Sequence, residues 1–181
     1  SLAEELSTLN NTARDWGGWD DTYTFIEDAN EAYIKSNLGD ISSFLNCRVN
    51  VMFYIHSSGR VVFAKAYDLN AKNEIPVPES LQEHIAPDSL LLRHTDAESS
   101  QTGVVLLPEG AMLIVSQPIV TSERKGPIRG TLLWGRYLDA AEVKRLAETT
   151  RLSLTMHRLD EAQMPPDFQM ARSALLDKAP I

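Results

Sequence analysis

The stretch RVNVMFYIHSSGRVVFAKAY, residues 48–67, decides the fold class of this chain. Between residues 49 and 55 an apolar side chain recurs at every second position, and this period of two is typical of a β-strand. Residues 57–59, Ser-Ser-Gly, predict a turn, and residues 61–67 predict the returning strand. The stretch therefore predicts a β-hairpin, which forms the first two strands of an antiparallel sheet.

More strands are expected on the C-terminal side of this hairpin. Strand-like patterns cover Gly103–Leu107, Ala111–Val120 and Ile128–Leu138, and a sixth strand is suggested by Leu152, Leu154 and Met156. Gly130 and Gly135 indicate a bulge or close backbone packing within their strand. Helices are expected after two capping residues, a short one near Leu81 after Ser80 and a longer one over Ala140–Thr149 after Asp139.

The first forty residues have a helical period. An apolar stripe in alternating steps of four and three is formed by Leu2, Leu6, Leu9, Ala13 and Trp16. Asn10-Asn11 and Gly17-Gly18 predict a break or kink in this helix, and a second helix is expected over Phe25–Leu38. Because the stripe is heptad-like, it also suits pairing with a second copy of the chain, so we expect a homodimer.

The order of these elements is that of a PAS-like antiparallel sheet. Helices come first, followed by the hairpin, a short helix, three meandering strands and a closing helix. We therefore expect an α+β fold in a single domain, residues 1–181. Its parts would be an N-terminal helical segment (1–46), a PAS-like core (47–138) and a C-terminal helix, strand and exit segment (139–181).

Composition excludes several classes of protein. The chain has 181 residues, with 17 Lys and Arg against 25 Asp and Glu, so its formal charge is −8. No basic cluster is present, which argues against nucleic acid as a partner. The single cysteine, Cys47, excludes a disulfide framework and any multi-cysteine metal site. No apolar run approaches the ~18 residues of a membrane span.

Residues 15–38, DWGGWDDTYTFIEDANEAYIKSNL, have the most distinctive composition of the chain. Asp15 to Tyr23 fits the pattern D-W-x-x-W-D-D-x-Y, and Tyr33 to Leu38 fits Y-x-x-x-N-L. This pairing resembles the fourth class of CHASE domains, the cyclase- and histidine-kinase-associated sensory extracellular domains. Further matching segments are residues 49–55, 59–62, 65–69, 75–78, 126–132 and 135–138. Gly17 and Trp134 depart from the family pattern, at positions that affect helix continuity and the shape of the pocket.

The resemblance implies a bacterial or archaeal sensor domain that lies between two transmembrane helices, on the periplasmic or extracellular side of the cell membrane. Such domains feed cytoplasmic diguanylate cyclase, cyclic-di-GMP phosphodiesterase or histidine kinase modules, and they are not enzymes themselves. The implied fold is PAS/Cache-like, with a long N-terminal helix packed on the sheet. Under this reading the lack of a membrane segment marks the edge of a piece cut between two spans.

A small-molecule ligand is expected between the sheet and its covering helices. Strand alternation places Lys65 and Tyr67 on one face of their strand, and Trp134 and Arg136 on one face of a later strand. If both faces meet one cavity, the two cations would bind an anionic ligand and the two rings would form its walls. The alternative is that Lys65 and Arg136 are solvated, or that Arg136 pairs with an aspartate of the DWGGWDD motif.

The motif itself has two interpretations. In the functional one, Asp15, Asp20 and Asp21 form a ligand or metal site with aromatic walls. In the other, Trp16 and Trp19 anchor the helix against the sheet while the aspartates cap backbone groups. The second interpretation is preferred, and it assigns a structural or signalling role to all the motif residues, Asp15, Trp16, Trp19, Asp20, Asp21, Tyr23, Tyr33 and Asn37.

Catalytic and metal motifs are absent from the sequence. The four histidines, His56, His84, His94 and His157, have no metal-ligand spacing, and no nucleophile elbow, Walker loop or dinucleotide fingerprint occurs. We therefore expect no cofactor, no metal and no catalytic residue. Two alternatives to the receptor hypothesis remain: a PAS-type ligand-binding module of a cytoplasmic regulator, and a small hydrolase with an unrecognised site.

Overall fold

The structure is a computed structural model that describes residues 1–86, 88–150, 165–166 and 168–169. The chain divides into two compact units, Ser1–Asp139 and Ala140–Ile181. The second unit contains helix α6 (Ala140–Thr150), as the sequence predicted. The expected strand at residues 152–156 lies outside the described residues. No helix among the described residues has the length and apolar content needed to cross a membrane.

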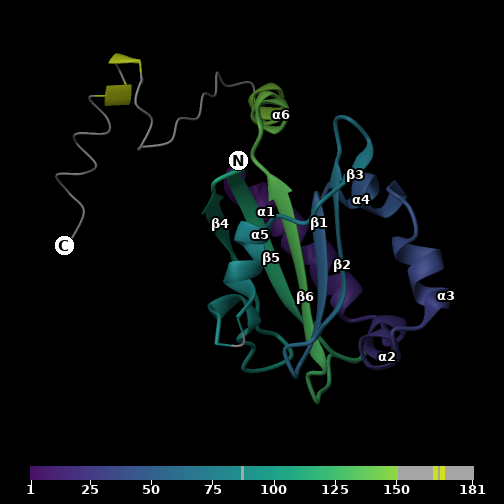
Figure 1. The fold of residues 1–181 in the computed structure, drawn as a ribbon. Helices are drawn as coiled ribbons and strands as arrows, with labels where there is room; N and C mark the ends of the chain where they lie inside the picture. The colour runs from purple at the N-terminus through teal and green to yellow at the C-terminus, as the bar shows by residue number, and fades with distance from the viewer. Residues whose placement is uncertain (87, 151–164, 167, 170–181) are drawn as a thin grey trace. The chain divides into compact units, whose positions relative to one another are not determined.

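The first unit is built on one antiparallel sheet. Its strands are β1 (Val51–His56), β2 (Val61–Asp68), β3 (Asn73–Ile75), β4 (Gln101–Leu107), β5 (Gly110–Ile119) and β6 (Gly130–Tyr137), in the spatial order β3-β2-β1-β6-β5-β4. β1 and β6 occupy the centre of the sheet, as Figure 1 shows. Without the short edge strand β3, this is the five-stranded PAS-like arrangement that the chain order predicted.

The predicted hairpin is confirmed by the pairing of β1 with β2. The register places Val51 opposite Ala66 and Tyr54 opposite Phe63, and one irregularity follows between Tyr54 and Ile55. β1 is buried on both faces up to Ile55 because both faces of the sheet are covered. The strict alternation in the sequence therefore identified the strand, although it did not separate a buried face from an exposed one.

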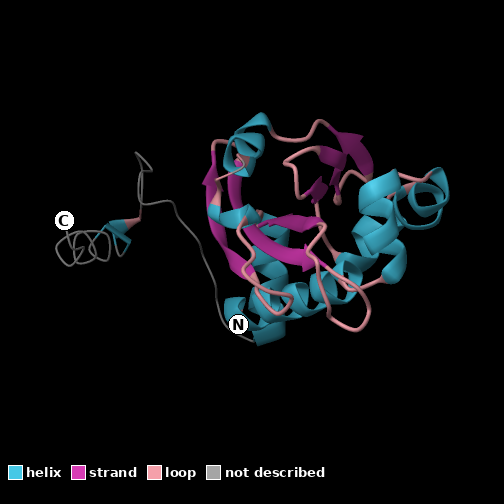
Figure 2. Ribbon diagram, turned by 90° about the horizontal axis from the view of Figure 1, so that it is seen from below, coloured by secondary structure: helices cyan, strands magenta, loops and turns pink. Residues whose placement is uncertain are grey.

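The N-terminal helices cover one face of the sheet, which we call the helix face (Figures 1 and 2). α1 (Leu2–Gly17) begins with a capping box between Ser1 and Glu4, and its end at Gly17 confirms one of the two predicted breaks. No break occurs at Asn10-Asn11, because α1 continues through both residues. α1 packs on β5 and β6. Leu9 and Ala13, two residues of the heptad-like stripe, are buried against this sheet, while Leu2 is 41% exposed.

The expected second helix over residues 25–38 is not continuous. α2 (Asp20–Asp28) ends where Ala29 adopts a left-handed conformation with φ 52°, and the side chain of Asn30 then caps α3 (Glu31–Tyr33). A π-helical turn, η1 (Ile34–Leu38), follows α3, and α4 (Ser42–Cys47) leads into β1. The prediction missed this break because alanine is a good helix former, and only the tertiary structure imposes the positive φ.

The opposite face of the sheet, the loop face, is covered by the segment between β3 and β4. This segment contains α5 (Glu79–Gln82) and the 3₁₀ turns η2 (Glu83–Ile85) and η3 (Leu90–Leu92). Leu81 of α5 and Leu107 join Phe53, Ile114 and Leu133 in the core on this face. The short helix was predicted correctly, but it begins at Glu79 with Pro78 as its N-cap, so Ser80 is not the capping residue.

Candidate functional site

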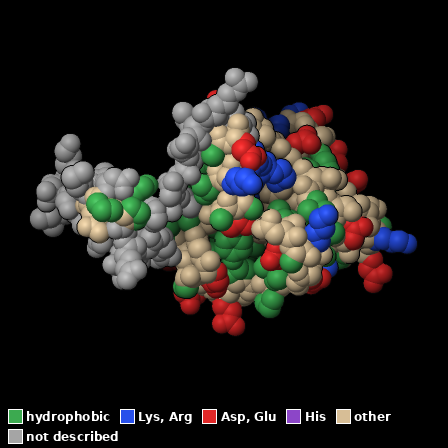
Figure 3. Space-filling view, turned by 90° about the horizontal axis from the view of Figure 1, so that it is seen from above, with side chains coloured by type: hydrophobic (Ala, Val, Ile, Leu, Met, Phe, Trp, Pro, Cys, Tyr) green, Lys and Arg blue, Asp and Glu red, His purple; other side chains and the backbone are tan. Residues whose placement is uncertain are grey.

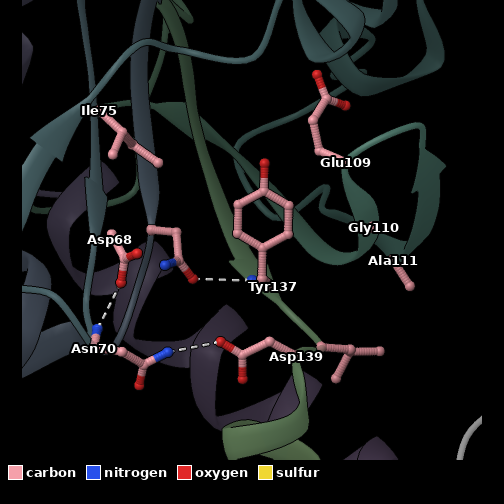
Figure 4. Close-up of a pocket in the computed structure, with 10 residues that line it drawn as sticks. Asp68, Asn70, Ile75, Glu109, Gly110, Ala111, Tyr137 and Asp139 are labelled. Carbon is pink, nitrogen blue, oxygen red and sulfur yellow. Dashed lines mark hydrogen bonds between the residues drawn. The ribbon is translucent and has the colours of Figure 1, made fainter.

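The loop face ends in a pocket of about 240 Å³, which we call the strand-end pocket (Figure 4). It lies where β2 ends, where β4 turns into β5, and where β6 ends. Its lining residues, which come from segments far apart in the sequence, are Asn50, Asp68, Asn70, Ile75, Glu109, Gly110, Ala111, Tyr137, Leu138 and Asp139. The register of the sheet brings these segments together, because β1 lies between β2 and β6.

Asn50 fixes the frame of this pocket. This residue is buried, with only 7% of its surface exposed. The amide Nδ2 donates to the carbonyl oxygen of Tyr67 at 3.1 Å, and Oδ1 accepts from the backbone N–H of Tyr137 at 3.0 Å. One buried side chain therefore links the end of β2 to the end of β6, and both of its polar ends are satisfied as burial requires.

Three carboxylates line the strand-end pocket, and each contacts a group of the chain itself. Asp68 Oδ1 accepts from the backbone N–H groups of Asn70 and Ala71, at 2.8 and 2.9 Å. Asp139 Oδ2 accepts from Asn70 Nδ2 at 3.0 Å, and Glu109 accepts from the Ser80 hydroxyl at 2.6 Å. No lysine or arginine is among the residues that line the pocket, so its local charge is negative.

Tyr137 provides the aromatic surface of the pocket. Figure 4 shows its ring standing between Ile75 and Glu109, with the hydroxyl group pointing away from the β6 backbone. Burial, and secondarily the carboxylate of Glu109, raise the pKa of Tyr137 above its usual value. The phenol therefore stays neutral near pH 7 and is able to donate or accept a hydrogen bond.

The four residues predicted to bind a ligand share the helix face, as strand alternation indicated. Met52 lies opposite both Lys65 and Trp134, so these two side chains project from the same side of the sheet. Trp134 is fully buried and packs edge to face on Trp16, at a centroid distance of 5.3 Å. Tyr67 packs against Phe44 of α4 at 4.7 Å. On the face where the sequence predicted a ligand, the rings of Trp134 and Tyr67 therefore contact the N-terminal helices.

The two cations of that predicted site contact carboxylates of the chain itself. Arg136 has a side chain that is 6% exposed, and it donates to Glu5 at 2.8 Å and to the carbonyl oxygens of Arg48 and Cys47. Lys65 lies 3.4 Å from Glu74 of the edge strand β3, and its side chain is 25% exposed. The alternative interpretation of Arg136 predicts an ion pair with a motif aspartate; the ion pair forms, but its carboxylate is that of Glu5. The binding of an anion by Lys65 and Arg136 stays a prediction.

The aromatic residues of segment 15–38 make packing contacts. Trp16 stacks on Trp19 at 4.6 Å, and Tyr33 stacks on Phe25 at 4.4 Å. The Tyr33 hydroxyl lies 2.7 Å from the Thr22 hydroxyl and 3.3 Å from that of Tyr54 in β1. These contacts attach α1, α2 and α3 to the centre of the sheet.

Three polar residues of the same segment form hydrogen bonds to backbone groups. Both carboxylate oxygens of Asp20 accept hydrogen bonds from Ser122, at 2.9 Å each, which fixes the loop between β5 and β6. The hydroxyl of Tyr23 donates to the carbonyl oxygen of Pro127 at 3.0 Å, and Asn37 donates to that of Tyr33.

The remaining two aspartates of the motif lie apart from these bonds. Asp15 is exposed on α1. Asp21 lines a second pocket of about 240 Å³ in the helical layer, together with Thr24, Asn30, Ala32, Tyr33, Ser36 and Asn37. Asp21, Tyr33 and Asn37 therefore line one pocket, and Asp15 and Asp20 are not among its lining residues. A ligand site built from Asp15, Asp20 and Asp21 stays a hypothesis.

Catalytic chemistry has little support among the described residues. No group of three or more His, Cys, Asp or Glu side chains there is placed to hold a metal ion. Burial raises the pKa of Cys47 to about 11, so its thiol is protonated at neutral pH and is a poor nucleophile. On the molecular face shown in Figure 3, Lys and Arg side chains lie in small groups beside Asp and Glu side chains.

Sequence reasoning missed the strand-end pocket as a candidate site. A signal was present, because Asp68, Ile75 and Tyr137 all lie in segments that match the CHASE pattern. Those segments are residues 65–69, 75–78 and 135–138. The turn residue Glu109 carried no such signal. Only the sheet register shows that these segments meet at one edge.

Comparisons with known proteins agree with this fold. The family profile of the CHASE4 domain matches residues 1–157. The methanogenesis regulatory histidine kinase FilI of Methanothrix harundinacea (strain 6Ac) is 37% identical over 155 residues, which are 86% of this chain and 17% of that protein. The chain therefore spans less than a fifth of the length of this curated relative.

Two solved structures are similar in fold. One is a domain of a protein assigned to the sensory box/GGDEF family from Vibrio parahaemolyticus, with a TM-score of 0.51 and 15% identity, covering 80% of this chain and 60% of that one. The other is the extracellular domain of a protein assigned as the histidine kinase vpHK1S-Z8, with a TM-score of 0.51 and 17% identity, covering 84% and 58%. These similarities confirm the predicted α+β fold of the PAS/Cache type.

Proposed function

We propose, from the premise that the chain belongs to the CHASE4 family of sensory domains, that it is the extracytoplasmic input domain of a membrane-anchored signalling receptor. Its task would be to bind a small molecule in the strand-end pocket and to pass the binding event to the rest of the receptor. CHASE4 is a sensory domain, so no catalytic step is assigned to this chain.

The observation that carries this proposal is the link that Asn50 makes across the pocket. Asn50 holds Tyr67 at the end of β2 and Tyr137 at the end of β6. A ligand that contacts Tyr137 therefore acts on the central strand of the sheet at its last residue. In the sequence, helix α6 begins at Ala140, three residues later. A change in the geometry of this strand end would thus enter the chain directly before α6.

The size of the signal depends on how much more tightly the ligand binds one receptor state than the other. A ligand shifts an equilibrium between two receptor states only by its preference for one of them. A shift from 1:99 to 99:1 requires a preference of about 5.5 kcal/mol, so a small ligand with a few polar contacts would produce a partial shift. The hydrogen bonds from Asn70 to Asp139 and from Ser80 to Glu109 join exposed side chains, which fits side chains that rearrange at low cost around the buried Asn50.

The receptor around this domain is also part of the proposal. We infer two flanking transmembrane helices and a cytoplasmic histidine kinase or diguanylate cyclase module, because relatives of these two classes share the sequence or the fold. We infer a homodimer as well. Leu9 and Ala13 are buried in the chain's own core, so pairing would use the first turns of α1, where Leu2 is exposed.

The test is a thermal-shift screen of the chain against a panel of small metabolites. A ligand present at one hundred times its Kd stabilises the folded state by about 2.7 kcal/mol. For a domain of this size, that raises Tm by roughly 5–11 °C. Tyr137→Ala should abolish the shift, and Tyr137→Leu, which keeps apolar packing, should do the same. Tyr23→Ala is the matched control, because Tyr23 contacts Pro127 before the opposite end of β6.

Two results would overturn the proposal. One is a ligand that stabilises both Tyr137 variants as much as the wild type, because binding would then lie outside the strand-end pocket. The other is a panel in which no compound shifts Tm, together with unchanged output of the full receptor carrying Tyr137→Leu.

A further inference from the structure

We infer that the strand-end pocket selects a small organic cation, an aliphatic ammonium ion, over neutral and anionic molecules of the same size. This inference rests on the proposed function, and it adds the chemical class of the ligand. It is the opposite of the anionic ligand that was expected at Lys65 and Arg136.

The charges around the pocket give the first argument. Asp68, Glu109 and Asp139 come from three different parts of the chain and line one cavity that has no Lys or Arg in its lining. Asp68 and Glu109 each use one oxygen for a bond within the chain, and their second oxygens have no partner among the described residues. An ammonium N–H group would donate to these oxygens, whereas a carboxylate ligand would be repelled by them.

The magnitude of this preference is large enough to decide between ligands. A carboxylate about 4 Å from the charge of a ligand attracts a cation and repels its anionic analogue, so the two effects add when the ligands are compared. Even with the full screening of bulk water, one such carboxylate favours the cation by roughly 30-fold in affinity.

The apolar lining gives the second argument, which is independent of charge. The half-buried ring of Tyr137 and the side chains of Ile75 and Leu138 form a surface for alkyl groups. A tyrosine ring also attracts a cation placed over its face. A bare metal ion would leave this surface unused, so a cation with an alkyl part fits the lining better.

The size of the cavity limits the alkyl part. At about 240 Å³ the pocket is below the range of about 300–1,000 Å³ that is usual for drug-sized ligands. The ligand is therefore an amine with a short carbon chain. The buried frame of Asn50, which bonds backbone groups of both flanking strands, prevents the pocket from widening easily.

Three probes with the same carbon chain test the inference: n-butylammonium chloride, 1-butanol and sodium butyrate, at constant ionic strength. Thermal shift and calorimetry on the chain should show stabilisation and heat of binding for n-butylammonium alone. Glu109→Gln and Asp68→Asn keep the hydrogen bonds to Ser80 and to the backbone, and each should weaken binding about tenfold, which is 1.4 kcal/mol. Glu123→Gln is the control, since Glu123 pairs with Lys125 in a loop that does not line the pocket.

The outcomes separate this inference from the proposed function. Binding of butanol or butyrate that Tyr137→Leu abolishes would retain the pocket and overturn its preference for cations. Binding of n-butylammonium that is unchanged in Glu109→Gln and Asp68→Asn would also overturn it. If none of the three probes binds, the inference fails, and the metabolite panel alone then decides whether the pocket is a ligand site.

Discussion

Gly130 occupies a position in which even a methyl group has no room. It is the first residue of β6 and pairs with His56 of β1. A Cβ atom on Gly130 would lie 2.3 Å from the carbonyl oxygen of Ile55, 2.9 Å from Cγ1 of Ile26 and 3.2 Å from Cα of His56. Two of these three atoms are backbone of the neighbouring strand, so no side-chain rotation relieves the overlap.

The substitution Gly130→Ala should therefore separate β1 from β6 at this end of the sheet. Overpacking of a core costs about 1–3 kcal/mol, and each backbone hydrogen bond lost adds about 1 kcal/mol. We expect the free energy of unfolding to fall by about 3 kcal/mol. For a domain of this size, Tm should fall by roughly 6–12 °C.

Two other strand glycines provide matched controls. A Cβ atom on Gly135 would lie 2.4 Å from Sδ of Met112, the flexible part of a side chain that can rotate away. Gly135→Ala should therefore cost only about 1 kcal/mol. At Gly103 a Cβ atom would meet nothing within 4 Å, so Gly103→Ala should be neutral or stabilise by about 0.5–1 kcal/mol.

Urea and thermal unfolding, followed by far-ultraviolet circular dichroism, measure all three variants. We expect the stability of the variants to fall in the order Gly103→Ala, Gly135→Ala, Gly130→Ala. If Gly130→Ala unfolded within 1 kcal/mol of the wild type, or if Gly135→Ala were the less stable of the two, the close approach of β1 to β6 would be refuted.

Three further predictions concern buried polar groups. Glu5→Gln removes the charge that faces the buried Arg136 guanidinium, so we expect a loss of about 2 kcal/mol in urea unfolding, and an unchanged midpoint would contradict the pairing. Burial lowers the pKa of His94 to about 4, below its usual 6.5. As the pH falls, the unfolded chain therefore takes up a proton at His94 before the folded chain does. Stability is full above pH 6.5 and should be lost progressively as pH falls toward 4, by about 1–2 kcal/mol at this partly exposed site; His94→Gln should flatten this part of the pH profile of Tm. Tyr33→Phe leaves two hydroxyl groups without their partner and should cost about 1–2 kcal/mol, measured by urea unfolding, whereas Tyr23→Phe, with its exposed bond, should cost less than about 1 kcal/mol.

The sheet was predictable because its signal is local. Alternation from Val49 to Ile55 and the Ser-Ser-Gly turn are enough to specify a hairpin. Strand β3 was missed, since three residues followed by Pro76 carry too short a pattern to be recognised. It pairs with β2 because the chain returns along that edge, which is a property of the tertiary structure.

The candidate site was predictable only in part. Strand alternation correctly placed Lys65 and Trp134 on one face, but it could not say which face carries helices. That choice is made by long-range contacts such as the packing of Trp16 on Trp134. The strand-end pocket depends on where Asp68, Glu109 and Tyr137 meet, and these residues approach one another only after the strands have paired.

All three tryptophans of the chain belong to one contact group, with Trp16 between Trp19 and Trp134. Two of them lie in the α1–α2 region and the third lies in β6, so the intrinsic fluorescence of this protein reports on a single helix–sheet junction. A displacement of α1 relative to the sheet would change the environment of every fluorophore at once. The native chain therefore contains its own optical probe, and stopped-flow fluorescence could follow that displacement in real time without labelling.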